Sequence, residues 1–474
     1  MSTSTTSSTS TTTTATTTSN LASKTLVIDN GAHSIKIAYA NSQSSADTSN
    51  LIQPIVIPNQ VGKTKKEKKY ILGDDLAKFH NASEIRLRNP MDHGYICSWG
   101  IEKEIWDYLF KRDDLKVKPS ETNLLMTEAP FAMDDIRKAL YETVYEQYKF
   151  KSLCLTSSST LGLLNYKSEN TTLPIYSSPC HLVVDCGYSS THIVPHFLGN
   201  RLNYAVKRVN VGGKILTNYL KEIVSFRYWD MMHETRLINT IKERVCYISQ
   251  DFMGDLMKCK DESSSITVDY VLPDYRNNNN TGFIKNEPYY PVSITKKSYF
   301  GHPNKHQKEQ KEEEEEKDNT DEQDKEMTDD QETTNTTTTE EPEEQILELT
   351  NERFTVPELL FNPSDIGINQ GGIAESIVQS INSTNINMHQ PLYSNILLLG
   401  GSTLYPGFKE RLENDLRKLA PDDLPIKIYT TEDPIMAPVY GGMKMALQND
   451  FSRLSVTKAE YEEHGYILCN RKFN

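Results

Sequence analysis

LVVDCGYSSTHIVPHF, residues 182–197, is an apolar run that turns sharply at Asp-Cys-Gly and continues as a second apolar run. The same outline occurs 156 positions earlier (185 minus 29) as LVIDNGAHSIKIAYA, residues 26–40. Apolar runs on either side of a short glycine-containing turn are typical of two strands joined as a hairpin. The sequence therefore predicts two equivalent hairpins, each with an aspartate at its turn.

An Asp-x-Gly turn between two strands has a chemical use. Glycine lets the backbone approach a ligand closely, and successive backbone N–H groups form a cradle for anionic oxygens. An aspartate there can hold Mg²⁺ through the water molecules that the metal retains. One such turn is more often a plain turn, but two that face each other would hold a polyphosphate from both sides. Lys36, on the strand after the first turn, would neutralise phosphate charge.

The length and composition predict two lobes with unfolded segments around them. The 474 residues exceed what one hydrophobic core usually organises, and the apolar fraction of 37% and the mean hydropathy of −0.58 are low for a folded chain. Residues 309–344 hold 18 Asp and Glu against 3 Lys, a net charge of −15, whereas the whole chain carries −14. The rest of the chain is therefore nearly neutral, which argues against direct, specific DNA binding through a basic face.

The cysteines and the apolar runs indicate a reduced protein outside the membrane. The seven cysteines are odd in number and none has C-x-x-C spacing, so we expect buried thiols in an intracellular protein and no zinc site. No run approaches about 18 apolar residues, so no transmembrane helix is expected. The N-terminus lacks the charged and apolar regions of a secretion signal.

Strand and helix patterns alternate along the body of the chain, which predicts an α/β fold. Apolar residues at helical spacing predict helices over 100–110, 134–149 and 236–252. Residues 209–226 read as a strand, a glycine turn and a helix. A third buried strand ends at Gly400-Gly401 and is followed by an amphipathic helix.

These features resemble actin and the actin-related proteins. The resemblance rests on the two hairpins and on TEAP (127–130), IKERVCYISQDF (241–252), ERFTVPELLFNPSDIGI (352–368) and LLLGGSTLYPGFKERL (397–412). It covers about 25–300 and 345–474, and the stretches 208–235 and 268–274 most resemble one nuclear branch of the family. The resemblance implies an actin-like α/β fold: two RNase H-like lobes around a cleft that holds ATP or ADP with Mg²⁺.

The resemblance also divides the chain into segments. They are a disordered Ser/Thr-rich tail (1–24), a first lobe (25–180) with a short basic tip (58–73), the first part of a second lobe (181–275), an insert that is Asn-rich and then acidic and disordered (276–344), the second part of the second lobe (345–440) and a C-terminal segment that returns to the first lobe (441–474).

The family's nucleotide contacts carry over to residues of this chain by position. An exposed Lys-Glu pair on a helix usually only faces solvent. Lys242 and Glu243 are therefore assigned to the nucleoside by the resemblance alone. No catalytic residue is assigned. The expected contacts are Asp29, Asn30, Gly31 and Lys36 on the first phosphate loop, Asp185 and Gly187 on the second, Gly212 and Gly213 near the ribose, Lys242 and Glu243 at the nucleoside, Gly400 and Gly401 at the adenosine, and Asp29 and Asp185 as Mg²⁺ ligands through water.

Several departures from the family weaken the site as an enzyme. Ala32 stands where the family has a hydroxyl on the terminal phosphate, His33 replaces a glycine, and Tyr188 replaces a carboxylate near the metal. An ungapped alignment across KFKSLCL places Lys151 where a glutamine orients the attacking water. His192 keeps the other water-facing position, or is an ordinary strand histidine. Since hydrolysis depends on positioning that water, we expect nucleotide binding with weak hydrolysis at most.

The sequence of the tip predicts that the protein does not polymerise. Residues 58–73 are shorter than the family's docking loop and carry KTKKEKK (63–69), whose like charges repel one another. A filament needs a retained head-to-tail contact. KTKKEKK is also a weak candidate for nuclear import because Glu67 interrupts it.

The nuclear branch implies a structural subunit of an ATP-dependent chromatin-remodelling complex that exchanges histone 2A for its Z variant. The expected partners are the remodeller ATPase and its accessory subunits, with histones as an open addition, and the expected location is the nucleus, with a cytoplasmic pool left open. Two alternatives remain: an active ATPase or kinase of the actin, chaperone and sugar-kinase superfamily, and a cytoskeletal actin-related protein. The acidic insert is either a histone-binding patch or, more commonly for such segments, a solvated loop.

Overall fold

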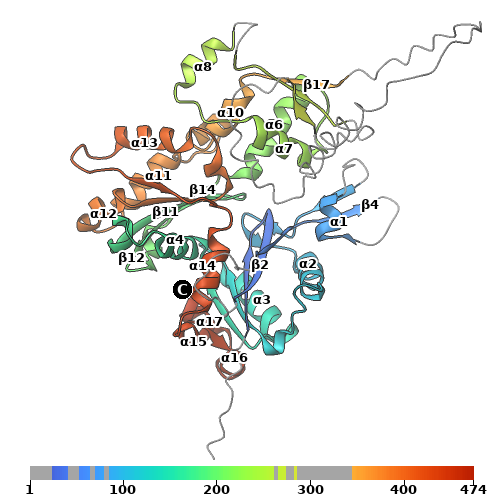
Figure 1. Ribbon diagram of the computed structural model, residues 1–474, viewed down its shortest axis with the longest axis vertical. Helices are drawn as coiled ribbons and strands as arrows, with labels where there is room; N and C mark the ends of the chain where they lie inside the picture. The colour runs from blue at the N-terminus through green and yellow to red at the C-terminus, as the bar shows by residue number, and fades with distance from the viewer. Residues whose placement is uncertain are drawn as a thin grey trace, which may run out of the picture.

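The computed structural model contains two sheets of the same build, one in each lobe (Figure 1). The predicted tail, the tip residues 65–69 and most of the predicted insert lie outside the described residues. The structure describes residues 24–40, 53–64, 70–78, 85–260, 265–273, 282–285 and 344–473.

The sheet of the first lobe contains the first predicted hairpin. Strand β1 pairs antiparallel with β2, so that Asp29 lies opposite Lys36, and β1 pairs parallel with β9 on its other side. The C-terminal segment returns to this sheet, where β20 pairs antiparallel with β10. In sheet order the strands are β20 (Val456–Thr457), β10 (Ser152–Thr156), β9 (Asn123–Thr127), β1 (Thr25–Asn30), β2 (Ser34–Ala40) and β3 (Ile55–Pro58).

The sheet of the second lobe repeats these connections. Strand β11 pairs antiparallel with β12, which places Asp185 opposite His192, and β11 pairs parallel with β18. The prediction of two α/β lobes with equivalent hairpins is confirmed. The strands are β13 (Asn200–Arg201), β12 (Thr191–Phe197), β11 (Cys180–Cys186), β18 (Ile396–Leu399) and β19 (Ile428–Thr430), with β14 (Lys207–Val209) also paired to β12.

Two smaller sheets extend the lobes beside the cleft. In the first lobe, β4 lies between β5 and β6 next to α1, and a short hairpin, β7 and β8, follows. In the second lobe, β15 lies between β16 and β17 near α6, α7, α8 and α10 (Figure 1). The bounds are β4 (Val61–Thr64), β5 (Tyr70–Ile71), α1 (Gly73–Lys78), β6 (Ile85–Arg88), β7 (Met91–Asp92), β8 (Tyr95–Ile96), α6 (Gly213–Arg227), α7 (Thr235–Val245), α8 (Phe252–Lys258), β15 (Val268–Val271), β16 (Phe283–Ile284), β17 (Ile346–Leu349) and α10 (Glu352–Glu358).

The remaining helices cover the two large sheets. The predicted helix over 134–149 is α3 followed by a wider π-helical turn over Glu142–Gln147. None of the helices in the described ranges combines the length and the apolar character of a membrane span. The bounds are α2 (Trp99–Lys111), α3 (Asp134–Tyr141), α4 (Ser158–Glu169), α5 (Pro174–Ser177), α11 (Ile373–Asn382), α12 (His389–Tyr393), α13 (Phe408–Leu419), α14 (Ala437–Ala446), α15 (Phe451–Leu454), α16 (Lys458–His464) and α17 (Tyr466–Phe473).

The prediction of one helix over 236–252 is wrong. The first helix, α7, ends at Val245, and a separate helix, α8, begins at Phe252. Between them, Tyr247 N donates to Arg353 O at 3.0 Å and Ile248 N donates to Pro406 O at 2.8 Å. These contacts use the amide groups that a continuing helix would need for its own hydrogen bonds. The apolar spacing therefore reflects burial in the lobe and not one continuous helix.

Helices α4 and α14 join the lobes. Figure 1 shows them between the two halves, with α14 against β1 and β2 of the first sheet and α4 against β11 and β18 of the second. Their crossing is close because α14 has glycine at the contact: a Cβ on Gly441 would overlap the carbonyl oxygen of Leu161. The crossing fixes how the two lobes sit around the cleft.

Each lobe has its own buried core, as the length predicts. One core surrounds β11, β18 and the helices of the second lobe, and the other surrounds β1, β9 and α2 of the first. All seven cysteines are free and five are buried, which confirms the predicted buried thiols.

Candidate functional site

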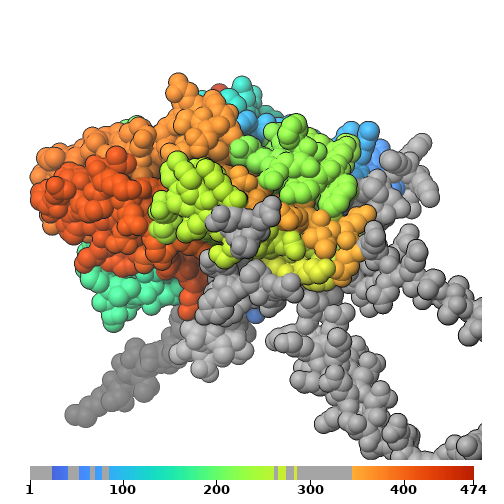
Figure 2. Space-filling view, turned by 90° about the horizontal axis from the view of Figure 1, so that it is seen from above, coloured from blue at the N-terminus to red at the C-terminus, as the bar shows by residue number. Residues whose placement is uncertain are grey.

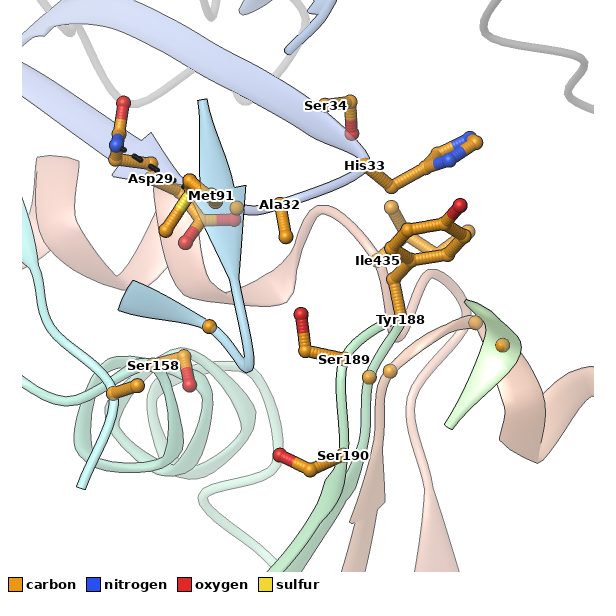
Figure 3. A pocket seen from close by; sticks show the side chains of 18 of the residues that line it. Asp29, Ala32, His33, Ser34, Met91, Ser158, Tyr188, Ser189, Ser190 and Ile435 are labelled. Carbon is orange, nitrogen blue, oxygen red and sulfur yellow. Dashed lines mark hydrogen bonds between the residues drawn. The ribbon is translucent and has the colours of Figure 1, made fainter. Parts of the chain in front are cut away.

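The two predicted turns face each other across a cleft of about 470 Å³ between the lobes. Figure 3 shows side chains from both turns directed into it. Gly212 is the only predicted contact that does not line the cleft: a Cβ there would lie 2.7 Å from Tyr188 O and Ser190 N, so its backbone supports the second turn. The predicted contacts in the lining are Asp29, Asn30, Gly31, Lys36, Asp185, Gly187, Gly213, Lys242, Glu243, Gly400 and Gly401.

Asp29 of the first turn is held by an ion pair and a hydrogen bond. Lys36 Nζ lies 2.9 Å from Asp29 Oδ2, and both side chains are nearly buried. Thr127 Oγ1 donates to Asp29 Oδ1 at 2.8 Å and accepts from Asn30 N at 3.1 Å. The spacing of seven residues brings Asp29 and Lys36 opposite each other on β1 and β2. Thr127, the first residue of TEAP, is a contact that the sequence did not assign.

A buried polar cluster that includes two side chains of α2 supports the first turn. Asn30 Nδ2 donates to Glu102 Oε1 at 2.7 Å, and Trp106 Nε1 donates to Asn30 Oδ1 at 3.2 Å. Asn59 Nδ2 donates to Gly31 O at 3.0 Å and lies beside the same Glu102 carboxyl. Glu102 is fully buried, and this burial raises its pKa to about 7. The protonated carboxyl is therefore the form that the fold favours.

Glu102→Gln is expected to remove a pH dependence of stability. The folded-state pKa of about 7 lies above the ordinary value of 4.5, so the contribution of Glu102 is complete below pH 4.5 and is lost as the pH rises through 7. This difference corresponds to about 3 kcal/mol. Urea unfolding at pH 5 and pH 8 should show the variant gaining stability over the natural protein at pH 8.

Glu104, an exposed glutamate on the same helix, provides the matched control. Glu104→Gln should leave the pH profile of stability unchanged. If Glu102→Gln followed the natural protein at both pH values, the buried carboxyl would have no such influence.

Asp185 of the second turn accepts a hydrogen bond from the first lobe. Ser158 Oγ donates to Asp185 Oδ2 at 2.6 Å from the first residue of α4. Burial raises the pKa of Asp185, and Asp29 raises it further, whereas the hydrogen bond from Ser158 and the charge of Lys36 lower it. The two aspartates are therefore close enough to influence each other across the cleft.

The predicted role of Lys151 is wrong. Lys151 is exposed and precedes β10, where its amide N donates to Pro119 O and Thr122 O. Parallel strands present their carboxyl ends to a ligand crevice, and Lys151 lies at the opposite end of its strand. Ser158, which follows the carboxyl end of β10, is the residue of this segment that reaches the cleft.

Among the residues that the structure describes, two histidines line the cleft, and both are weak bases. Burial, followed by the charges of Arg208 and Arg201, lowers the pKa of His192 to about 3. Burial and the nearby cations, Lys242 first among them, lower the pKa of His33 to about 4. Both rings are therefore neutral at pH 7, and neither is well matched to accept a proton from an attacking water.

Lys242 is not part of a solvated face, because only 3% of it is exposed. Its Nζ donates to Gly213 O at 3.1 Å, Thr217 Oγ1 at 2.8 Å and Asn239 Oδ1 at 2.9 Å, all of them neutral oxygens. Burial lowers its pKa. Glu243 is half-buried and accepts from Asn239 Nδ2 at 2.8 Å. A buried ammonium that lines a cleft favours an anionic ligand.

The backbone conformation at position 400 requires glycine. Its φ of +87° is rare for residues with a side chain, and a Cβ there would overlap the carbonyl group of Cys186. The turn after β18 therefore lies directly on the turn between β11 and β12. Gly401 lies beside Ile435 with more space around it.

Direct contacts join the two lobes beside the cleft, whose lining includes Tyr95. Arg208 Nη1 donates to Tyr95 OH at 3.1 Å and Nη2 donates to His93 O at 3.0 Å. Lys214 Nζ lies 3.0 Å from Asp92 Oδ1. These pairs join the β7–β8 hairpin to the second lobe. The sequence did not predict them, because they form only when the two lobes are in place.

The residues of the cleft fit a nucleotide with Mg²⁺. Lys36 and Lys242 provide positive charge at two places in the lining, and Gly31 and Gly187 provide backbone at each turn. Among the described residues, no group of three or more His, Cys, Asp and Glu side chains is arranged to hold a metal. A metal between Asp29 and Asp185 would therefore take its other ligands from phosphate and water, as Mg²⁺ commonly does.

Comparison with known proteins agrees with this geometry. The family model for actin matches residues 20–474. Actin-related protein 6 of Dictyostelium discoideum is 55% identical over 96% of this chain and 95% of its own length. The proteins of that name from Arabidopsis thaliana and Drosophila melanogaster are 37% and 32% identical, over 95% of this chain and at least 99% of theirs. The resemblance to the actin family, and within it to the actin-related proteins of this name, is confirmed.

Proposed function

The chain belongs to the actin family, and from this premise we propose that it is a non-catalytic structural subunit of an ATP-dependent chromatin-remodelling complex that exchanges histone 2A for its Z variant. The similarity to proteins named actin-related protein 6 supports the choice of this branch of the family. The proposed role of the cleft is to hold ATP or ADP with Mg²⁺ without turnover.

One observation carries the non-catalytic part of the proposal: the groups in the cleft that could activate water are committed or weak. Asp29 pairs with Lys36, and Asp185 accepts from Ser158. His192 and His33 have pKa values far below 7. Rapid hydrolysis needs a positioned water and a base near the operating pH. This arrangement favours binding over the ATPase or kinase alternative.

Bound nucleotide would contribute to the stability of the fold. Asp29 and Lys36 belong to the first lobe, and Asp185 and Lys242 to the second, so a ligand between them contacts both. A ligand that binds only the folded state raises the free energy of unfolding by mass action. When bound, the nucleotide and Mg²⁺ supply the phosphate oxygens and the charge that hold these two sets of residues together.

The experiment that tests the proposed role is purification of the native complex from nuclei through a tag on this chain. Mass spectrometry of the purified material should identify a remodeller ATPase with its accessory subunits and a nucleotide bound to this chain. Recovery of the chain alone, or with cytoskeletal proteins, would instead favour the cytoskeletal alternative.

The tip of the first lobe supports a protein that does not polymerise. Arg236 Nη1 on α7 donates at 2.8 Å to Leu76 O on α1, the helix that directly follows the tip, so this end of the first lobe is tied to the second lobe of its own chain. Lys63, at the start of the basic run, is exposed. Under polymerising salt the protein should stay in the supernatant, and filaments in the pellet by electron microscopy would contradict this prediction.

An exposed apolar surface at the end of α6 is the proposed docking place for a partner subunit. Phe226 is 92% exposed, and Trp229 and Met232 are each 42% exposed. Side chains of this size seldom gather on the surface of a protein without partners. Tyr228 OH donates to Glu348 O, which places this surface beside β17, and Figure 2 shows the green segment of α6 and α7 next to the orange segment of β17.

The charges around this surface indicate the chemistry of the partner. Glu222, Asp230 and Glu348 are exposed, whereas Arg227, the cation between them, pairs with Glu352. An acidic rim around an apolar centre favours a partner segment with apolar anchors and flanking Lys or Arg. We therefore assign this surface to a basic segment of an accessory subunit.

Replacing both Phe226 and Trp229 with alanine is expected to weaken association with the complex by about thirtyfold, since a central aromatic anchor contributes about 2 kcal/mol or more. Co-purification at increasing salt would measure the loss, and the remaining association should be more salt-sensitive. Ile386→Ala, which changes another exposed apolar residue, is the control. Equal recovery of both variants would exclude this surface as the docking place.

A further inference from the structure

A pair of aromatic rings connects the two phosphate loops across the cleft. His33 lies on the turn between β1 and β2, and Tyr188 lies on the turn between β11 and β12. Their ring centroids are 4.9 Å apart with an interplanar angle of 44°. Figure 3 shows the two side chains packed against each other from opposite sides of the cleft. The pair is therefore a direct contact between the lobes.

We propose that His33 and Tyr188 form a gate that must open before a nucleotide can bind. The proposal rests on the proposed nucleotide binding and adds a determinant of which ligands enter. With the rings in contact, the inner part of the cleft accepts a small oxyanion such as inorganic phosphate. A nucleotide, which must reach from the phosphate loops to the nucleoside side, requires the rings to separate.

The surroundings of the pair place it between these two parts of the cleft. On the inner side, Ala32, Ser189, Ser190 and, farther from the rings, Ser158 line the space between the two turns (Figure 3). On the outer side, a Cβ on Gly213 would lie 3.2 Å from Tyr188 Cδ2.

Charged residues of the nucleoside side also act on the two rings. Burial raises the pKa of Tyr188 to about 12, with a further contribution from Glu243. Burial is the main cause of the lowered pKa of His33, and Lys242 is the first of the charges that add to it. Lys242 and Glu243, the residues predicted at the nucleoside, are therefore close enough to the two rings to influence them.

The chemistry of the rings favours the closed arrangement. Both rings are neutral at pH 7, so they pack without the cost of burying a charge. Lys36 and Arg236 also face His33, and both keep its ring in the neutral form. A tilted aromatic pair favours contact over separation by about twofold to tenfold beyond the burial of its surface. A ligand that binds only the open arrangement loses affinity by the same factor.

Binding of fluorescent ADP with Mg²⁺ tests the gate in the full chain. Tyr188→Ala and His33→Gly should each raise the affinity by about twofold to tenfold and speed association. The double variant should bind like either single variant, because each change already removes the contact. Tyr188→Phe keeps the ring and should behave like the natural protein. Thermal unfolding of each variant shows that the fold is retained, and binding of inorganic phosphate should be unchanged.

The outcomes separate the gate from the nucleotide site itself. If the natural protein binds the nucleotide as tightly as Tyr188→Ala and His33→Gly do, or more tightly, the gate is overturned and the proposed function is left intact. Absence of nucleotide binding in the natural protein and in every variant overturns both. Binding that appears or strengthens only when the ring contact is removed supports the gate.

Discussion

Replacing Lys36 with methionine is expected to lower the free energy of unfolding by about 3 kcal/mol and to abolish measurable nucleotide binding. Lys36 Nζ lies 2.9 Å from Asp29 Oδ2, and both side chains are nearly buried. Removing one partner of a buried ion pair leaves an uncompensated charge, which costs about 3–5 kcal/mol. The remaining Asp29 carboxylate would also repel phosphate. Urea unfolding and nucleotide titration measure the two effects.

Two further variants separate stability from binding. In the double variant Asp29→Asn with Lys36→Met, the buried charge is gone and Oδ1 can still accept from Thr127, so stability should return while nucleotide binding should not. Lys63→Met changes an exposed lysine of the same lobe and should alter neither property. Strong nucleotide binding by Lys36→Met would show that the ligand does not contact this lysine.

The second large effect is expected at the crossing of the two helices that join the lobes. Gly441→Ala should destabilise the protein by about 1–3 kcal/mol, because the added Cβ would overlap Leu161 O on α4. In an open helix the same change would stabilise by about 1 kcal/mol, since alanine forms helices better than glycine. The sign of the change therefore reports the close contact, and thermal unfolding measures it.

Gly100, in the first turn of α2, is the matched control, because a Cβ there meets nothing within 4 Å. Gly100→Ala should leave stability unchanged or raise it. If the two substitutions had the same effect, α4 and α14 would not be packed as closely as the structure places them.

The sequence predicted those parts of the fold and site that depend on local pattern. The two hairpins were visible because each has its own apolar strands and its own Asp-x-Gly turn. Lys36 was predicted on the strand after the first turn, and the structure adds that it pairs there with Asp29 across the two antiparallel strands. The predicted turn at Gly400 also has a local cause, since its positive φ requires glycine.

The rest depends on contacts between distant parts of the chain. Lys151 was misplaced because an alignment without gaps cannot locate the end of β10, and Ser158 reaches the cleft instead. A lysine on a helix usually faces solvent, but Lys242 is buried, and its ammonium group donates hydrogen bonds to Gly213, Thr217 and Asn239. The contact of His33 with Tyr188 exists only because the two lobes place their turns together.

The central claim is that the cleft holds a nucleotide and does not split it, and a single-turnover experiment tests this most directly. Protein in excess over γ-labelled ATP, with Mg²⁺ present, is incubated and quenched at intervals, and released phosphate is counted against a sample without protein. The predicted result is that the label stays bound to the protein and is recovered as intact ATP. Release of a full equivalent of phosphate within minutes would contradict it.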